Sequence, residues 1–301
     1  MKQKKNPRFR FSGSIDMEII RRQVKRHRRS VLGQWTIRIV VAAMIVTGTY
    51  LVIENQTYTS VATADSHKKD TEDSNQYIAF SDGVIRYSRD GVVFLNKKNK
   101  EKWIQPCQIQ NPIVDVNEDV FAIADVGGNT IMIFQKSGLK GEIETTLPIE
   151  KISVSNQGIV SAILKNESTP QIISYDAVGN ILVEHQVNLN STGYPISLDM
   201  SADGENLMVS YLSTKNGTLK SMVAFYNFGK EGQEKTDNLI YTEDFDQTVV
   251  PDVFYMDAST SVAVGDKSFV IYEGTKSVKK KTEVKLNQEI RSEFHSERYI
   301  G

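Results

Sequence analysis

The chain has 301 residues, of which 40% are hydrophobic, and its formal net charge is −1. This is enough to bury a sizeable core, as one large domain together with a membrane segment. The charge is unevenly divided, because residues 1–53 hold 12 Lys/Arg and 2 acidic residues while the remainder holds 24 basic and 35 acidic residues. An acidic C-terminal part argues against nucleic-acid binding, which needs a basic face. The single cysteine, Cys107, excludes an intramolecular disulfide, and we interpret it as a small buried hydrophobe.

Residues 1–34 form a basic tail. Ser14 is placed to cap a helix that runs to Arg29, with Ile15, Ile19 and Val24 on an apolar stripe. The basic residues around that stripe predict contact with an anionic inner leaflet, or they serve only to set the orientation in the membrane.

Residues 35–53 are predicted to be a single transmembrane helix that acts as a signal anchor. The uncharged run 39–53 is shorter than the roughly 20 apolar residues that a bilayer core needs. Extension to Trp35 includes Arg38, which can reach the headgroups from near the helix end. A buried core helix is disfavoured because no helical pattern nearby could surround it. A cleaved signal peptide is the stronger alternative, since residues 61–64 resemble a cleavage site, although they lie far past the apolar run.

The basic flank predicts a cytoplasmic N-terminus and an extracellular C-terminal domain in a single-pass protein of the cell membrane. Residues 54–76 are rich in polar residues and almost without apolar periodicity, which predicts a flexible polar stalk. Residues 77–301 then form the extracytoplasmic domain.

Short strands recur in this domain. One kind of strand recurs at residues 120–124, 159–163, 207–211 and 261–264. A second kind ends in an aromatic ring and precedes Gly138, Gly179, Gly229 or Gly274, at residues 130–134, 171–175, 222–226 and 268–272. A third kind precedes the first, at residues 113–116, 151–154, 196–200 and 253–256.

Successive copies of the first strand begin 39, 48 and 54 residues apart, and polar insertions at 191–194, 213–219 and 231–238 explain the longer steps. A period of about 40 residues with four strands predicts an all-β fold, a β-propeller of four-stranded blades. A β-sandwich or a β-solenoid is the alternative. Five blades are expected, at residues 77–110, 111–150, 151–194, 195–248 and 249–287.

A sixth unit begins at Gln288, with residues 289–291 as its first strand and residues 299–301 at the start of its second. A propeller closes by pairing its first and last blades, so we expect this propeller to be incomplete. We expect the natural protein to continue for at least one more blade. In the alternative, a five-bladed ring, residues 288–301 add a strand to the first blade.

The strand–turn–strand units at residues 133–143 and 174–184 resemble blades of quinoprotein-like and WD40-like propellers. With the tail, anchor and stalk, residues 30–301 resemble a domain-of-unknown-function family of membrane-anchored, propeller-like proteins of Gram-positive bacteria. The resemblance implies a propeller at the cell envelope, and it brings no catalytic or binding residues. Trp103 alone occupies a position like the regular tryptophans of quinoprotein dehydrogenase blades.

No catalytic, cofactor-binding or metal-binding residue is predicted, and no cofactor. His185 and His295 lack a cysteine or acid at ligand spacing. The segment from Asp199 to Gly204 departs from a calcium loop, and its residues 201–204 predict a turn. Residues 127–129 predict a hairpin turn. Aspartates that cap turns at strand ends are expected at Asp115, Asp125 and Asp257.

Propeller enzymes usually bring acids, arginine or histidine to the axis, and the inner strands 113–116 and 151–154 offer few. This favours a binding or scaffolding module at the cell envelope, with a protein, peptide or glycan partner. A quinoprotein-like enzyme and a receptor that signals through the basic tail are the alternatives.

Overall fold

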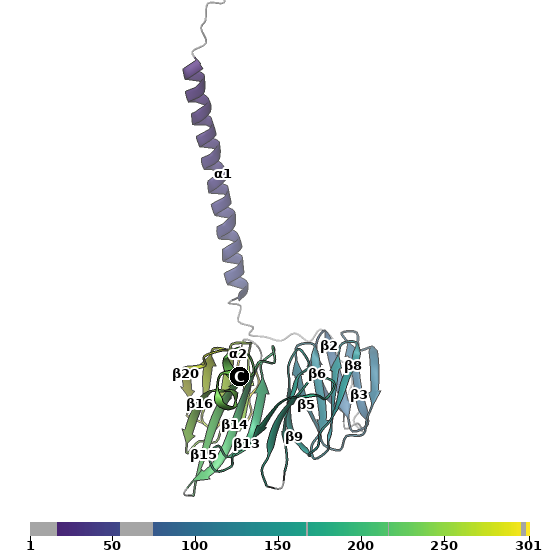
Figure 1. Ribbon diagram of the computed structural model, residues 1–301. Helices are drawn as coiled ribbons and strands as arrows, with labels where there is room; N and C mark the ends of the chain where they lie inside the picture. Colours follow the sequence, from purple (N-terminus) through teal and green to yellow (C-terminus); the bar gives the residue numbers. More distant parts are fainter. Residues whose placement is uncertain (1–16, 55–74, 167, 216, 296–298) are drawn as a thin grey trace, which may run out of the picture. The chain divides into compact units, whose positions relative to one another are not determined.

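The structure is a computed structural model that describes residues 17–54, 75–166, 168–215, 217–295 and 299–301 (Figure 1). The chain divides into two compact units, Met1–Lys69 and Asp70–Gly301.

The first unit contains one continuous helix, α1 (Met17–Glu54). Within α1, Lys25–Ile53 has a mean hydropathy of 2.0 and is long and apolar enough to cross a membrane. The sequence predicted two separate helices here, but a lone Gly33 costs a helix only about 1 kcal/mol and no proline interrupts the segment. The expected cap at Ser14 lies outside the described residues.

Polar groups inside the apolar part of α1 are locally satisfied. The hydroxyls of Thr47 and Thr49 donate to the carbonyls of Ala43 and Ile45, each at 2.9 Å. The Arg38 guanidinium lies over the Trp35 ring, 5.6 Å from its centroid. Because bilayer hydrocarbon offers no hydrogen-bonding partner, these internal contacts suit a helix that enters a membrane.

The second unit consists of five antiparallel sheets, each with four strands in chain order from the inner to the outer edge. The first sheet contains β1 (Gln76–Phe80), β2 (Gly83–Ser88), β3 (Gly91–Asn96) and β4 (Glu101–Pro106). The second contains β5 (Pro112–Asn117), β6 (Val120–Asp125), β7 (Thr130–Gln135) and β8 (Gly138–Glu144). The third contains β9 (Ile149–Val154), β10 (Val160–Leu164), β11 (Gln171–Tyr175) and β12 (Ile181–Gln186).

The fourth sheet contains β13 (Tyr194–Met200), β14 (Asn206–Lys215), β15 (Thr218–Asn227) and β16 (Leu239–Asp246). The fifth contains β17 (Asp252–Tyr255), β18 (Thr260–Val264), β19 (Ser268–Glu273) and β20 (Lys279–Lys285). These sheets are the predicted blades, and the predicted all-β propeller fold is confirmed.

Each pair of neighbouring sheets shares a hydrophobic cluster. Phe94 of the first sheet and Phe121 of the second belong to one cluster, and Val154 of the third joins Ile133 of the second in another. The middle strands are therefore covered on both faces, and every residue of β10 is buried. This explains why their sequences are continuous apolar runs, whereas outer strands such as β12 alternate between exposed and more covered positions.

One glycine marks how closely two blades approach. A Cβ atom added to Gly141 in β8 would lie 1.8 Å from the carbonyl oxygen of Ala177 in the β11–β12 turn. Any larger residue would separate the second and third sheets at this point.

Two predicted insertions have regular structure. Residues 213–219 largely extend the β14–β15 hairpin, because Lys215 pairs with Thr218 in the ladder. Residues 231–238 include most of α2 (Lys230–Gln233) and the 3₁₀ helix η1 (Thr236–Asn238), with a turn between them. The sequence identified these segments only as polar insertions, and exposed strand and helix ends tolerate such residues.

The predicted first strand of a sixth blade at residues 289–291 is wrong. Ile290 donates its amide to the Asp266 carbonyl at 2.8 Å instead of joining a ladder. Phe294 and Gly301 exchange two backbone hydrogen bonds, of 3.0 and 2.9 Å, beside a bridge between His295 and Ile300. The strand-like pairing near the C-terminus therefore begins at Phe294, a few residues after the strand that was predicted around Ile290.

Trp103 joins the first two sheets. Its ring stacks on Phe134 with centroids 5.1 Å apart and planes at 7°, and its Nε1 donates to the Lys136 carbonyl at 3.1 Å. The position that the sequence singled out is therefore an inter-blade contact.

We predict that Trp103→Ala lowers the free energy of unfolding by about 2–4 kcal/mol, because both the stacking and the hydrogen bond are lost. Ile104→Ala on the same strand is the control, since Ile104 is 57% exposed. Urea unfolding of the full chain in detergent, followed by circular dichroism, measures both. Equal losses in the two variants would contradict this role for Trp103.

Candidate functional site

The inner strands β5, β9, β13 and β17 contact one another in that order and line a cavity of about 340 Å³ together with His295. We call this the axial cavity. The polar side chains in its wall are those of Asp115, Asn117, Lys151, Ser153, Ser197, Asp199, Asp252 and His295.

A repeated set of hydrogen bonds connects neighbouring blades beside this cavity. Asp115 Oδ2 accepts the Val154 amide at 2.6 Å. Ser153 Oγ accepts the Met200 amide at 2.9 Å, and Asp199 Oδ2 accepts the Tyr255 amide at 2.6 Å. In each case an inward-pointing side chain binds the backbone of the next blade. We call these three contacts the cross-blade hydrogen bonds.

Ser153 also connects two of the carboxyl groups. Its hydroxyl donates to Asp199 Oδ1 at 2.7 Å, and it lies within hydrogen-bonding range of Asp115. Burial, followed by the nearby Asp115 carboxyl, raises the pKa of Asp199 to about 8. Burial also raises the pKa of Asp115, although hydrogen bonds from Val154 and Ser153 oppose the shift. At neutral pH the two groups therefore retain a proton between them.

The remaining polar groups of the axial cavity are also partly engaged. Ser197 donates to Asp252 Oδ1 at 2.7 Å. His295 stacks on Phe254, with centroids 3.6 Å apart, and its Nδ1 lies 3.2 Å from Glu293 Oε2. Most of the polar groups that line the cavity thus bind the fold to itself.

The sequence assigned several of these residues incorrectly. Asp115 was expected to cap a turn at a strand end, but it lies within β5 and points to the axis. His295 was expected to lack a cysteine or acid at metal-ligand spacing, and among the described residues it belongs to no group that could hold a metal ion, although Glu293 lies beside it. The inner strands were expected to offer few acids, but Asp199 and Asp252 line the cavity as well. No local pattern in the sequence marked these positions, because the residues that line the cavity come from four separate inner strands.

Other sequence interpretations are confirmed. Asp257 Oδ1 accepts the Thr260 amide at 2.8 Å, so it caps a turn as expected. Asp125 does not cap its own turn, because its Oδ1 accepts the amide of Asn111 on the segment before β5 at 2.7 Å. Asp203 accepts the Glu205 amide at 3.0 Å in the turn predicted there. Residues 126–129 form the expected hairpin turn.

His185 and Cys107 lie outside the axial cavity. His185 is buried beside Tyr226, with ring centroids 4.7 Å apart, and burial lowers its pKa. Cys107 is half-buried rather than fully buried, and burial followed by the Asp90 carboxylate raises the pKa of its thiol.

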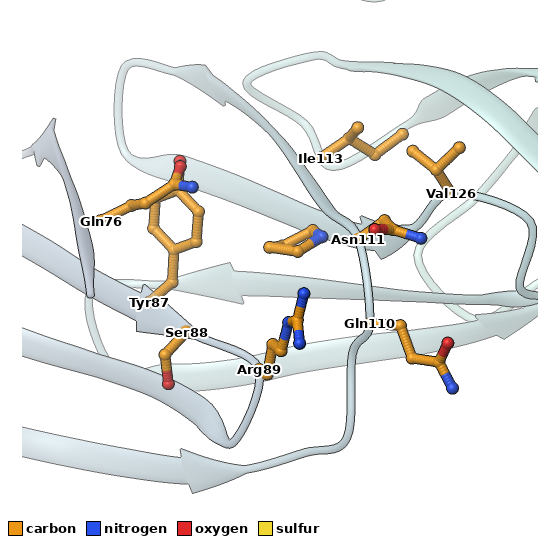
Figure 2. A pocket seen from close by; sticks show the side chains of 9 residues that line it. Gln76, Tyr87, Ser88, Arg89, Gln110, Asn111, Ile113 and Val126 are labelled. Carbon is orange, nitrogen blue, oxygen red and sulfur yellow. The ribbon is translucent and has the colours of Figure 1, made fainter. Parts of the chain in front are cut away.

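A second cavity of about 670 Å³ lies between the first and second sheets, and we call it the Arg89 pocket (Figure 2). Its lining comprises Gln76, Tyr87, Ser88, Arg89, Gln110, Asn111, Pro112, Ile113 and Val126. Figure 2 shows the Arg89 guanidinium extending between Tyr87 on one side and Asn111 on the other.

Local hydrogen bonds position this lining. The Arg89 carbonyl accepts the Ile109 amide at 2.9 Å, which joins the β2–β3 turn to the segment that leads into β5. The Val126 amide donates to the Asn111 carbonyl at 2.9 Å, so the β6–β7 turn is attached to the same segment. Backbone hydrogen bonds therefore hold the segments that form the pocket in place. No motif in the sequence indicated this pocket.

Among the described residues, no group of three or more His, Cys, Asp or Glu side chains could hold a metal ion. The axial cavity offers the carboxyl groups of Asp115 and Asp199, whose pKa values are raised by burial, and the Arg89 pocket offers a cation with neutral hydrogen-bonding groups.

The family of unknown function DUF5711 matches residues 54–301, and the chain belongs to this family. No curated protein matches the chain. Among solved structures it is similar to Kuenenia stuttgartiensis hydrazine synthase, with 13% identity and a TM-score of 0.50, over 76% of this chain and 72% of that chain.

It is also similar to the WD40 domain of Neurospora crassa Pan2, with 13% identity and a TM-score of 0.46, over 68% of this chain and 63% of that domain. Kluyveromyces lactis Hsv2 gives 9% identity and a TM-score of 0.47, over 70% of this chain and 73% of that chain. The chain thus spans less than two thirds of the length of the Pan2 domain. At such identities the likeness concerns the fold alone.

The raised pKa of Asp199 predicts a pH-dependent stability. A group whose pKa is higher in the folded chain stabilises the fold fully below its unfolded value, near 3.8, and this stabilisation is lost as pH rises through about 8. Asp199 is only partly buried, so solvent in the cavity weakens the effect. We therefore expect the free energy of unfolding to fall by on the order of 1–3 kcal/mol between pH 5 and 9. Asp199→Asn should reduce this decline, measured by urea unfolding across that range.

Asp257→Asn is the control. The pKa of Asp257 is lowered in the folded chain despite partial burial, because hydrogen bonds from Ser259 and Thr260 favour its charged form. Asp257 therefore stabilises the fold above its unfolded pKa and loses this effect only at acid pH. Its variant should keep the wild-type slope between pH 5 and 9. A wild-type slope in Asp199→Asn would contradict a shared proton at the axis.

Proposed function

We propose that this member of the DUF5711 family is a membrane-anchored propeller that binds a ligand outside the cell, at the Arg89 pocket. In this proposal, residues 1–34 are a cytoplasmic tail and residues 35–53 are an uncleaved signal anchor. Residues 54–76 are a stalk, and residues 77–301 are a binding module in the envelope of a Gram-positive bacterium.

The observation that carries the binding function is the different use of polar groups in the two cavities. Around the axial cavity, Asp115, Ser153 and Asp199 bind backbone amides of neighbouring blades. In the Arg89 pocket, the Arg89, Gln110 and Asn111 side chains have no hydrogen-bond partner within the part of the chain that is described. Their donors remain for a ligand, and a volume of about 670 Å³ falls in the range of small-molecule sites.

Charge distribution supports the outward orientation. Residues 1–53 hold 12 Lys/Arg and 2 acidic residues, and all of these basic residues except Arg38 lie before residue 35. The rest of the chain is acidic. Basic residues next to a membrane helix remain on the cytoplasmic side. Helix α1 supplies a suitable span in Lys25–Ile53.

We predict that external protease removes the propeller from intact cells that produce the full chain with an N-terminal tag, while the tail stays protected. Immunoblotting with antibodies to the tag and to the propeller follows both parts. The matched variant replaces Arg21, Arg22, Lys25, Arg26, Arg28 and Arg29 by Gln, and it should yield a protease-resistant fraction because the orientation signal is weakened. Protection of the wild-type propeller, with digestion only after permeabilisation, would refute the orientation.

A further inference from the structure

The Arg89 pocket has one cation and no acid in its lining. Arg89 is the charged member, and the other lining residues are amides, hydroxyls and apolar groups. A guanidinium binds a carboxylate through two parallel hydrogen bonds, which makes arginine the preferred partner for such a group. The pocket therefore favours a ligand with a negative end.

The surroundings leave the Arg89 guanidinium available. In the described residues it forms no ion pair, whereas Arg86 on the same hairpin lies 3.2 Å from Glu101. Asp125, which lies near the pocket, has Oδ1 occupied by the Asn111 amide at 2.7 Å. Asp90 follows Arg89 in the turn and acts on Cys107.

The neutral lining suits a peptide. Gln76 Oε1 accepts the Tyr87 hydroxyl at 2.7 Å, which leaves its Nε2 as a donor. Gln110 and Asn111 each offer a donor and an acceptor, the pair of groups that a peptide bond also presents. A phosphate group carries about −1.5 to −2 charges and would need more than one cation.

The acidic background gives the pocket selectivity. Residues 54–301 hold 35 acidic against 24 basic residues, so an anion is repelled over most of this region. An anion binds only where local attraction at Arg89 exceeds that repulsion. At short range, one guanidinium attracts one carboxylate strongly enough for this.

We infer that the Arg89 pocket binds a short peptide through its free carboxylate, with the neutral amides contacting the peptide groups behind it. This rests on the proposed binding function and names the ligand class. The Arg89 guanidinium holds the carboxylate, and Tyr87 and Ile113 supply apolar contact for the adjoining side chains.

The experiment uses the full chain in detergent micelles and isothermal titration calorimetry. The probes are N-acetyl-trialanine with a free carboxylate, the same peptide as its C-terminal amide, and inorganic phosphate. The acid should bind about tenfold more tightly than the amide, and Arg89→Gln should reduce the affinity for the acid to that for the amide. Arg86→Gln is the matched control and should bind like the wild type.

Arg89→Lys keeps the charge and should retain a preference for the acid, which protects the test if Arg89→Gln fails to fold. Equal affinity for acid and amide, an unchanged affinity in Arg89→Gln, competition by phosphate as strong as by the acid, or binding of neither peptide would overturn the inference. If both peptides bind equally and Asn111→Ala weakens both, the pocket is a binding site while the carboxylate assignment is wrong. The two failures are therefore distinguishable.

Discussion

The cross-blade hydrogen bonds are the interaction on which the propeller most depends. Each blade buries its faces against its neighbours, but hydrophobic packing alone allows neighbouring sheets to slide. A side chain that accepts the amide of the next inner strand fixes that register. Asp115, Ser153 and Asp199 do this for three successive junctions. Because burial, followed by the nearby Asp115 carboxyl, raises the pKa of Asp199, the strength of this arrangement depends on pH.

The cross-blade hydrogen bonds also distinguish the axial cavity from the Arg89 pocket, because they use polar groups of the axial cavity. At the axis, Asp115, Ser153 and Asp199 are used to hold blades together. The first sheet joins the second differently, through the Trp103–Phe134 stack and through the hydrogen bond between Arg89 and Ile109. That junction leaves the Arg89 pocket beside β1, with Arg89, Gln110 and Asn111 in its lining. We therefore expect ligand specificity to reside at this junction.

Much of the fold was predictable from the sequence, because blade strands are apolar runs separated by turns at a regular period. Strands that pack on both faces leave a strong signal, as in β6 and β10. The position of a residue relative to the axis leaves only a weak signal in the sequence. Asp115 was therefore interpreted as a turn cap, because a local pattern does not show which residues face the axis. The Arg89 pocket joins a turn, a connecting segment and β1, so no local motif marks it. Both strands of the hairpin β14–β15 were predicted, but its extension beyond them was taken for a polar insertion because its exposed end is polar.

Amide hydrogen exchange tests the role of the cross-blade hydrogen bonds most directly. The amides of Val154, Met200 and Tyr255 should exchange only through global unfolding in the full chain, with protection equal to that of the central amides of β10 and β14. If these three amides exchanged rapidly while β10 and β14 remained protected, the inner strands would not be held by these contacts. The axial carboxyl groups would then be free for another role.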